Sequence, residues 1–341
     1  MYQPDFEQLL KVLRREKPDR PVLFEFFMSG PVQEKLAGGP IRQDIPKIDR
    51  IRACLRAFHT GGYDYAVVPG WETDFVCFPK GKSEKKNSYS QNEGTVIHDE
   101  ASFAAYKWQT VKPEAYEILD LLRPDIPEGM KLIIPCCGGI EENMVELVGY
   151  EDLCFMQIDE PELVKRIADA IGSRLLAHYE HALKHDTVGA IMINDDWGFK
   201  TQTLMSPAFL REHIVPWYRK IAAAAHAAGR SVLMHSCGDL HEVWNDIIDD
   251  IKVDGKHSYE DGILPVENSY DEYGHRIAIL GGIDMDFLCR KTPDEIYKRS
   301  AEMIERTGGC RAYALGSGNS IADYVPVANY EAMTRAALEK R

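Results

Sequence analysis

Residues 231–239 read Ser-Val-Leu-Met-His-Ser-Cys-Gly-Asp, an apolar run of strand length that ends in polar side chains and a glycine. Residues 189–197 repeat this design, because the run Gly-Ala-Ile-Met-Ile is followed directly by Asn-Asp-Asp-Trp. Between the two, a helical stretch opens at Ser206-Pro207, an N-cap with proline at the first helical position, and Pro216 predicts a break in it. Apolar strands joined by helices are typical of a parallel sheet, so this stretch predicts an α/β fold.

The same alternation extends outward over the whole chain. It predicts eight strands. The first five are at residues 21–26, 65–68, 132–135, 189–193 and 231–234, residues 251–253 lead into the sixth, and the last two are at 277–280 and 311–315. Eight parallel strands alternating with helices indicate a (β/α)8 TIM barrel, and we expect residues 1–341 to form it as a single domain. An open doubly wound sheet is the alternative. Residues 71–99 hold turn residues among short β-like pieces, which predicts an inserted β segment over the barrel mouth.

The charge balance and the cysteine pattern exclude several classes of protein. The chain carries 40 Lys and Arg against 54 Asp and Glu, a net charge of −14, which disfavours nucleic acid and anionic membranes as partners. No apolar stretch approaches the ~20 residues that span a bilayer, and residues 1–20 lack the apolar core of a signal peptide. The 8 cysteines are scattered without a CxxC pair, as in proteins with reduced thiols, so we expect a cytoplasmic location.

His235 and Cys237 are the sharpest candidates for a metal site. In a TIM barrel the active site lies at the carboxyl ends of the strands, and both residues follow the predicted fifth strand directly. Imidazole nitrogen and thiolate sulfur are good zinc ligands, although a buried histidine beside an inert cysteine has the same spacing. Glu142, after the third strand, is the candidate third ligand, and its alternative role is to interact with a helix dipole. Cys310 precedes the eighth strand and therefore belongs to the opposite face.

Four further residues at strand ends are candidates for catalysis. Asp195 and Asp196 follow the fourth strand, where a carboxylate can act as a general base, orient a substrate or only cap the next turn. Lys256 and His257 follow the sixth strand, where they can stabilise a developing oxyanion or form a solvated turn.

Five residues are candidates for contact with a substrate. Trp197 and Phe199 follow the fourth strand and can form a wall for an aromatic ring, which Trp71 of the inserted segment would close. Asp284 and Asn319 belong to the turns Gly-Gly-Ile-Asp and Gly-Ser-Gly-Asn-Ser after the seventh and eighth strands. Aromatic rings in loops that fold back onto the protein more often serve packing, so a packing role is the alternative for these three rings.

Four stretches together resemble the uroporphyrinogen decarboxylase superfamily over nearly the whole chain from Pro21. They are NDDWGFKTQT at 194–203, HSCGD at 235–239, KHSYED at 256–261 and GSGNSIADYVP at 316–326. Within the superfamily the chain is similar to zinc-dependent methyltransferases that serve corrinoid proteins. The closest resemblance is to O-demethylase methyltransferases, which act on methoxylated aromatics such as vanillate or veratrole.

Two departures separate this chain from other branches of the superfamily. Uroporphyrinogen decarboxylases hold the substrate carboxylates with paired arginines after the first strand, where residues 25–30 read Glu-Phe-Phe-Met-Ser-Gly. Methyltransferases that methylate coenzyme M carry a third cysteine ligand in the loop after the eighth strand, where this chain has Ser317.

The resemblance implies methyl transfer from a methoxylated aromatic compound to the Co(I) of a separate corrinoid protein. Zinc on His235, Cys237 and Glu142 would draw charge from the ether oxygen. We expect the corrinoid on a partner protein, with residues 71–99 as the docking rim, because the chain shows no corrinoid-binding domain. The alternatives are a methylcobalamin-to-thiol methyltransferase of the coenzyme M type, a decarboxylase like uroporphyrinogen decarboxylase, and a non-catalytic ligand-binding barrel.

Overall fold

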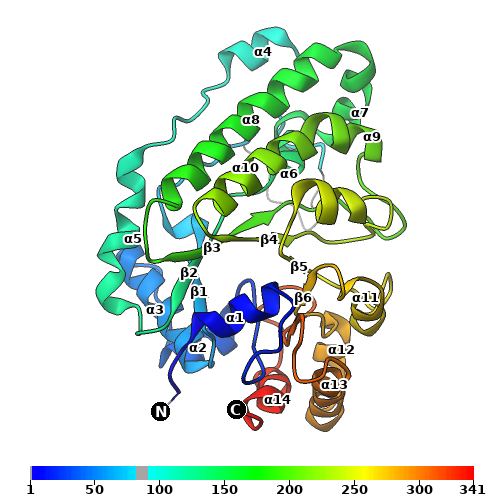
Figure 1. Ribbon diagram of the computed structural model, residues 1–341. Helices are drawn as coiled ribbons and strands as arrows, with labels where there is room; N and C mark the ends of the chain where they lie inside the picture. Colours follow the sequence, from blue (N-terminus) through cyan, green and yellow to red (C-terminus); the bar gives the residue numbers. More distant parts are fainter. Residues whose placement is uncertain (1, 82–90) are drawn as a thin grey trace.

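The computed structural model describes residues 2–81 and 91–341 and holds a curled parallel sheet of seven strands (Figure 1). The order in the sheet is the order in the chain: β1 Tyr65–Val67, β2 Lys131–Pro135, β3 Val188–Asn194, β4 Ser231–His235, β5 Gly255–His257, β6 Ala278–Leu280 and β7 Tyr313–Ala314. Almost every strand residue is buried, as a sheet covered on both faces requires. The predicted α/β, TIM-like architecture is therefore present.

Helices connect the strands and surround the sheet. They are α1 Phe6–Leu13, α2 Gly30–Ala37, α3 Lys47–Thr60, α4 Glu100–Ala105, α5 Ile118–Leu121, α6 Ile140–Val148, α7 Tyr150–Asp159, α8 Pro161–Ala182, α9 Pro207–Phe209, α10 Val215–Ala227, α11 Val266–Tyr273, α12 Met285–Arg290, α13 Pro293–Arg306 and α14 Val327–Leu338. In Figure 1, α6, α8 and α10 lie on one side of the sheet, and α13 and α14 on the other. Short 3-10 turns lie at Gly70–Glu72, Pro113–Tyr116 and Arg123–Asp125.

Helix starts and breaks follow the local sequence. The Ser206 hydroxyl accepts the Phe209 N–H at the start of α9, so the predicted N-cap is confirmed. The predicted break near Pro216 is confirmed as well, because a π-helical turn, Leu210–Ile214, precedes α10. A second π turn, Asp246–Ile251, ends at Lys252 in the left-handed conformation and turns the chain into β5.

The prediction of eight paired strands is wrong at the first of them. Residues 21–26 form a single bridge, Leu23 to Leu315, beside β7, with the Phe24 N–H 2.8 Å from the Leu315 carbonyl oxygen. On the other edge the Tyr65 hydroxyl bonds both the N–H and the C=O of Glu25, at 2.7 Å each. A side chain of β1 thus occupies the backbone groups that a ladder between this segment and β1 would use. The segment closes the gap in the sheet without being a strand.

The inserted β segment predicted at 71–99 is absent from its described parts. Residues 71–81 and 91–99 contain no strand, and residues 82–90 lie outside the described ranges. The two arms meet through one backbone hydrogen bond of 2.7 Å, from the Gly81 N–H to the Gly94 carbonyl. Val96 and Ile97 both donate to the Leu147 carbonyl at the end of α6, so the returning arm follows the barrel wall.

Across residues 2–81 and 91–341, no helix combines the length and the apolar character that crossing a bilayer requires.

Candidate functional site

Three potential metal ligands converge at the carboxyl ends of β3 and β4. The ligand atoms of Asp196, His235 and Cys237 all lie within 4.8 Å of one another. The His235 Nε2 is 3.5 Å from the Cys237 Sγ and 3.6 Å from the Asp196 Oδ1. A carboxylate oxygen, an imidazole nitrogen and a thiolate sulfur form a donor set that suits zinc, with room for a fourth ligand.

Two glycines allow the loops after β3 and β4 to touch. A Cβ atom on Gly198 would lie 2.6 Å from the Cys237 carbonyl oxygen, and one on Gly238, which has a φ of +80°, would lie 2.2 Å from the Gly198 carbonyl carbon. Because the backbones meet there, the Cys237 N–H donates to the Asp196 Oδ1 at 2.9 Å. The backbone of Cys237 thus holds the Asp196 carboxylate in place.

The imidazole of His257 sets the tautomer of His235. The Ser317 carbonyl can only accept, so the His257 Nε2, 3.3 Å away, carries a proton. Burial lowers the pKa of His257 well below its ordinary value, which leaves its Nδ1 bare. The His235 Nδ1 lies 2.9 Å from that nitrogen and must therefore donate. Burial also lowers the pKa of His235 to about 3, so its Nε2 presents a lone pair toward Cys237 and Asp196.

The sulfur of Cys237 also has polar neighbours outside the group of three potential ligands. The Asn319 side-chain amide donates to it at 3.2 Å, and the Ser258 hydroxyl lies 3.6 Å away. Burial, with the nearby Asp196 charge, raises the pKa of the Cys237 thiol to about 12. Asn319, predicted as a substrate contact, is thus placed by the structure on a candidate metal ligand.

The two adjacent aspartates have different surroundings. Asp195 is fully buried and accepts from five donors: the backbone N–H groups of Ile140, Glu141 and Glu142 at the start of α6, the Tyr218 hydroxyl and the Trp197 indole, at 2.7–3.1 Å. A Cβ atom on Gly139 would lie 2.1 Å from the Asp195 carboxyl carbon, so this close approach needs a glycine. Asp195 therefore holds the amino end of α6, whereas the Asp196 carboxylate lies beside His235 and Cys237.

Glu142 lies on that anchored first turn of α6. Its Oε2 accepts the Gly139 N–H at 2.9 Å, and Glu142 is outside the group of three close ligand atoms among the described residues. Burial raises its pKa well above the ordinary value, and the charges of Asp195 and Asp196 add to this effect. The concentration of acidic side chains around Asp196 is an environment that a divalent cation would stabilise.

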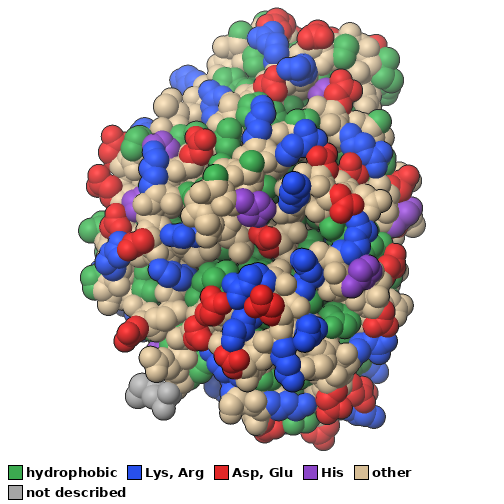
Figure 2. Space-filling model, in the orientation of Figure 1, with side chains coloured by type: hydrophobic (Ala, Val, Ile, Leu, Met, Phe, Trp, Pro, Cys, Tyr) green, Lys and Arg blue, Asp and Glu red, His purple; other side chains and the backbone are tan. Residues whose placement is uncertain are grey.

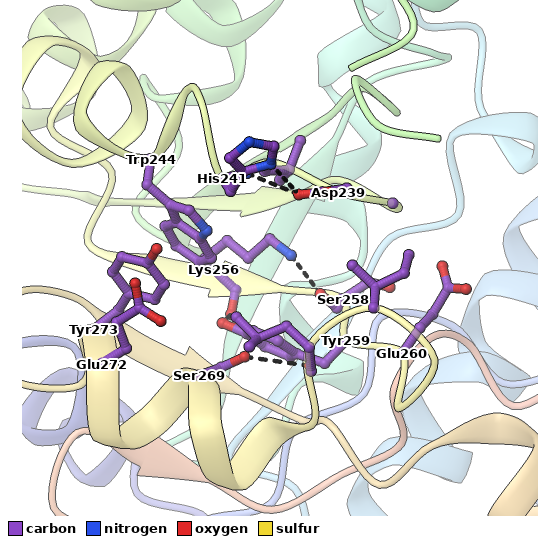
Figure 3. Close-up of a pocket in the computed structure, with 14 residues that line it drawn as sticks. Asp239, His241, Trp244, Lys256, Ser258, Tyr259, Glu260, Ser269, Glu272 and Tyr273 are labelled. Atoms are coloured by element: carbon purple, nitrogen blue, oxygen red, sulfur yellow. Dashed lines mark hydrogen bonds and ion pairs between the residues drawn. The ribbon is translucent and has the colours of Figure 1, made fainter. Parts of the chain in front are cut away.

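Lys256 and His257 face opposite sides of the sheet, because both lie within β5 rather than after it. His257 lies beside His235, whereas Lys256 points into a cavity of about 200 Å³ between the loop after β4 and α11 (Figure 3). Its ammonium lies 4.4 Å from the ring centre of Tyr259 and 5.5 Å from that of Trp244. Burial lowers the pKa of Lys256 to about 8.

The aromatic residues predicted to contact a substrate lie in different surroundings. Trp197 is fully buried with its indole on Asp195, while Phe199 and Trp71 are 61% and 62% exposed. Phe26 and Phe27, which the sequence reading missed, connect Trp71 with the cluster. Ring-centre distances are 4.6 Å from Trp71 to Phe27, 3.9 Å from Phe27 to Phe26 and 4.8 Å from Phe26 to His235.

Two further acids support loops around the site. Asp284, predicted as a substrate contact, caps α12 by accepting the Phe287 N–H, and it also accepts the Asp261 N–H. Glu25 is fully buried and accepts the N–H of Ser317 in the loop after β7. Glu25 is not among the candidates predicted from the sequence, although an acid inside the apolar run Val-Leu-Phe-Glu-Phe-Phe is a signal that could identify it.

Acidic and basic side chains are interspersed over the face of the molecule in Figure 2.

The comparisons with known proteins agree with this architecture. Residues 87–339 match the family model described as uroporphyrinogen decarboxylase (URO-D), and a search of curated proteins finds no match. A methyltransferase from Methanosarcina mazei is similar in structure, with a TM-score of 0.72, 18% identity and 97% of each chain covered. That likeness shows a shared fold.

Two xylanases are more distant. An intracellular enzyme from Thermoanaerobacterium saccharolyticum has a TM-score of 0.42 and 13% identity over 83% of this chain and 91% of that chain. A family 10 enzyme from Gloeophyllum trabeum has a TM-score of 0.42 and 10% identity over 68% of this chain and 82% of that chain. Neither supports a functional argument. Because the family model covers 87–339, most of the chain, the protein belongs to the uroporphyrinogen decarboxylase (URO-D) family.

Proposed function

We propose that this chain is a zinc-dependent methyltransferase that demethylates methoxylated aromatic compounds. The methyl group moves from the ether oxygen to the Co(I) of a corrinoid carried by a separate protein, and the aromatic product leaves as a phenolate. The observation that carries the proposal is the convergence of Asp196, His235 and Cys237 at the strand ends. The fold shared with a methyltransferase supports it.

The residues present fit a zinc ion. The His235 Nε2 is bare and faces the two other donors, and its Nδ1 is held by His257, the outer-shell arrangement common to zinc-binding histidines. Asp196 is the third ligand in this proposal, and Glu142, on the adjacent helix turn, is the alternative third carboxylate; either set leaves the fourth position open to the ether oxygen. Zinc bound there supplies Lewis acidity to the ether oxygen and stabilises the phenolate.

The chain's own residues hold this donor set in place. His257 keeps the lone pair of His235 directed at the cluster, and Asn319 donates to the Cys237 sulfur. Asp196 is fixed by the Cys237 N–H, and Asp195 anchors the helix turn that carries Glu142. Donors fixed by their own hydrogen bonds need no reorganisation when a substrate arrives.

His257 should control metal affinity without touching the metal. We expect His257→Phe to weaken zinc binding about 10–100-fold, the usual effect of losing the outer partner of a ligating histidine. The measurement is competition for zinc against a chelating dye. His226→Phe is the control, because that half-exposed histidine bonds Asp254 at the amino ends of β4 and β5, whereas the cluster lies at the carboxyl ends. Equal zinc affinity in both variants would contradict the role of His257.

The aromatic row Trp71, Phe27 and Phe26 supports an aromatic substrate. The row begins at a side chain that is 62% exposed and ends against His235, so it connects the surface with the cluster. We expect Phe27→Ala to raise the KM for a methoxylated aromatic about tenfold, equivalent to about 1.4 kcal/mol of stacking. Steady-state kinetics measure it, with Phe155→Ala, an exposed ring on α7, as the control. An unchanged KM for Phe27→Ala would remove the row from the substrate path.

Methylation of a thiol is less compatible with the site. Ser317 stands where a third thiolate would be expected, and its hydroxyl bonds Glu25 rather than facing the cluster. The deciding assay incubates the protein with a Co(I) corrinoid protein and a set of methoxylated aromatics, and follows methyl-cobalt absorption and phenol release. Formation of both supports the proposal. Methylation of a small thiol from methylcobalamin, without reaction of any ether, would overturn it.

Decarboxylation has little support at the site. The segment that follows the bridge to β7 carries the buried Glu25 and Phe26 and no cation, so carboxylates of a poly-acid would lie there unpaired.

A further inference from the structure

Glu25 is the one fully buried carboxyl group on the segment that closes the barrel. It has no exposed surface, lies between β1 and the loop after β7, and contacts no metal-ligand candidate directly. The Ser317 N–H donates to its Oε1 at 2.8 Å, and the Ser317 hydroxyl lies 2.6 Å from its Oε2. Space is tight, since a Cβ atom on Gly316 would lie 1.6 Å from the Phe24 carbonyl oxygen and 3.3 Å from the Glu25 Oε1.

The hydrogens around Ser317 can be counted. Its hydroxyl has one hydrogen, yet it lies 2.6 Å from two oxygens, the Glu25 Oε2 and the Asn319 backbone carbonyl. The carbonyl can only accept, so the hydroxyl hydrogen belongs to that contact. The contact with Glu25 then needs a hydrogen of its own, and the Glu25 Oε2 is the remaining atom that can carry it.

We propose that Glu25 is a protonated positioning residue whose carboxylic acid fixes the loop after β7, and through that loop His235 and Cys237. The Ser317 carbonyl accepts from His257, and His257 in turn orients His235. In the same loop, the Asn319 side-chain amide donates to the Cys237 sulfur. The action on these two ligands rests on the proposed function, whereas the protonation of Glu25 does not. A neutral acid supplies both a donor and an acceptor to Ser317, and a carboxylate would repel the carbonyl-rich loop.

The surroundings agree with a neutral acid. Burial raises the pKa of Glu25 from 4.5 to about 8, against the lowering effect of Ser317. The titratable side chains around it are the phenols of Tyr63, Tyr65 and Tyr330, whose own pKa values burial raises, together with His257 beyond Ser317, which burial keeps neutral.

The direct test is infrared difference spectroscopy of the full-length protein at neutral pH, wild type minus Glu25→Gln. A protonated carboxyl has a C=O stretch separate from all carboxylate bands, and it shifts in D2O. We expect this band in the wild type and not in Glu25→Gln. In Ser317→Ala, which removes the hydrogen-bond partner, we expect the band at a shifted frequency. A carboxylate band in place of the acid band would overturn the proposal.

The pH dependence of folding gives a second test on the same two proteins. The folded state keeps a proton on Glu25 that the unfolded chain loses above about pH 4.5. The stabilisation of the folded state by this proton is therefore complete below pH 4.5 and is lost as the pH rises toward about 8. The unfolding constant of the wild type should rise relative to that of Glu25→Gln about tenfold per pH unit across this window. A ratio that is independent of pH would contradict the protonation.

Zinc affinity tests the positioning. We expect Glu25→Gln to fold and to bind zinc within about threefold of the wild type, since the amide can donate to the Ser317 hydroxyl and accept its N–H. Glu25→Ala should lose about 10–100-fold, as for outer-shell partners. Failure of Glu25→Gln to fold, or equal losses in both variants, would overturn the proposal. The spectral and folding tests need neither metal nor substrate, so their outcome is independent of the proposed methyl transfer.

Discussion

Asp195→Ala should destabilise the protein by about 3–5 kcal/mol, the largest stability effect that we expect from one side chain of the site. The substitution leaves three backbone N–H groups at the start of α6, the Tyr218 hydroxyl and the Trp197 indole without their acceptor in a buried region. Each unsatisfied donor costs about 1–3 kcal/mol, and relaxation of the helix end recovers part of that sum. Denaturant unfolding followed by circular dichroism measures the change.

Asp196→Ala is the matched control for this prediction. The two aspartates are neighbours, but Asp196 is half-exposed and its partners include the Cys237 N–H and the His235 imidazole. Its removal should cost about 0.5–1.5 kcal/mol, the net value of one hydrogen bond, and should instead weaken metal binding. Equal destabilisation by the two variants, or full stability of Asp195→Ala, would show that the contacts of Asp195 do not anchor α6.

Cys237→Ala should abolish nearly all methyl transfer. The thiol supplies one of three candidate ligands, and a Lewis acid contributes several kcal/mol of charge stabilisation at the reacting oxygen. A loss of about 4 kcal/mol corresponds to a rate about 1,000-fold lower. The measurement is the single-turnover rate of methyl-cobalt formation with saturating methoxylated aromatic and Co(I) corrinoid protein.

Cys289→Ala controls for the loss of a cysteine as such. Cys289 lies on α12, is half-exposed and is outside the three-residue cluster, so its removal should leave the rate unchanged. The unfolding midpoint of Cys237→Ala checks that this variant folds. We expect it to fold, because the cysteine side chain is small and only partly covered. A folded Cys237→Ala protein with the wild-type rate would contradict any mechanism in which a metal on Cys237 takes part.

The sequence predicted the fold class and the core of the candidate site because both depend on short-range patterns. Apolar runs of strand length alternate with amphipathic helices, and residues that directly follow a strand reach the same edge of a parallel sheet. His235 and Cys237 were placed in this way, and the structure brings their ligand atoms together. Asp196 was predicted as a catalytic residue, and the structure adds its oxygen to the same group.

The features that were missed depend on contacts between distant segments. The identity of the residues at 195 and 196 cannot show which carboxylate faces α6 and which the cluster. The bridge of residues 21–26 to β7 was predicted as a full strand, because the sequence does not show that the Tyr65 hydroxyl takes the backbone groups of Glu25. Lys256 and His257 were predicted together after a strand, whereas they lie within β5 and alternate across it.

The most direct test of the metal site is the zinc content of the purified protein, measured by mass spectrometry after reconstitution and dialysis. We expect about one zinc per chain, lost in His235→Ala and Cys237→Ala and strongly weakened in Asp196→Ala. Glu142→Gln then shows whether that carboxylate is the third ligand in place of Asp196. A wild-type protein that retains no zinc after reconstitution, or retains it equally in His235→Ala and Cys237→Ala, would contradict the metal site and the methyl transfer that depends on it.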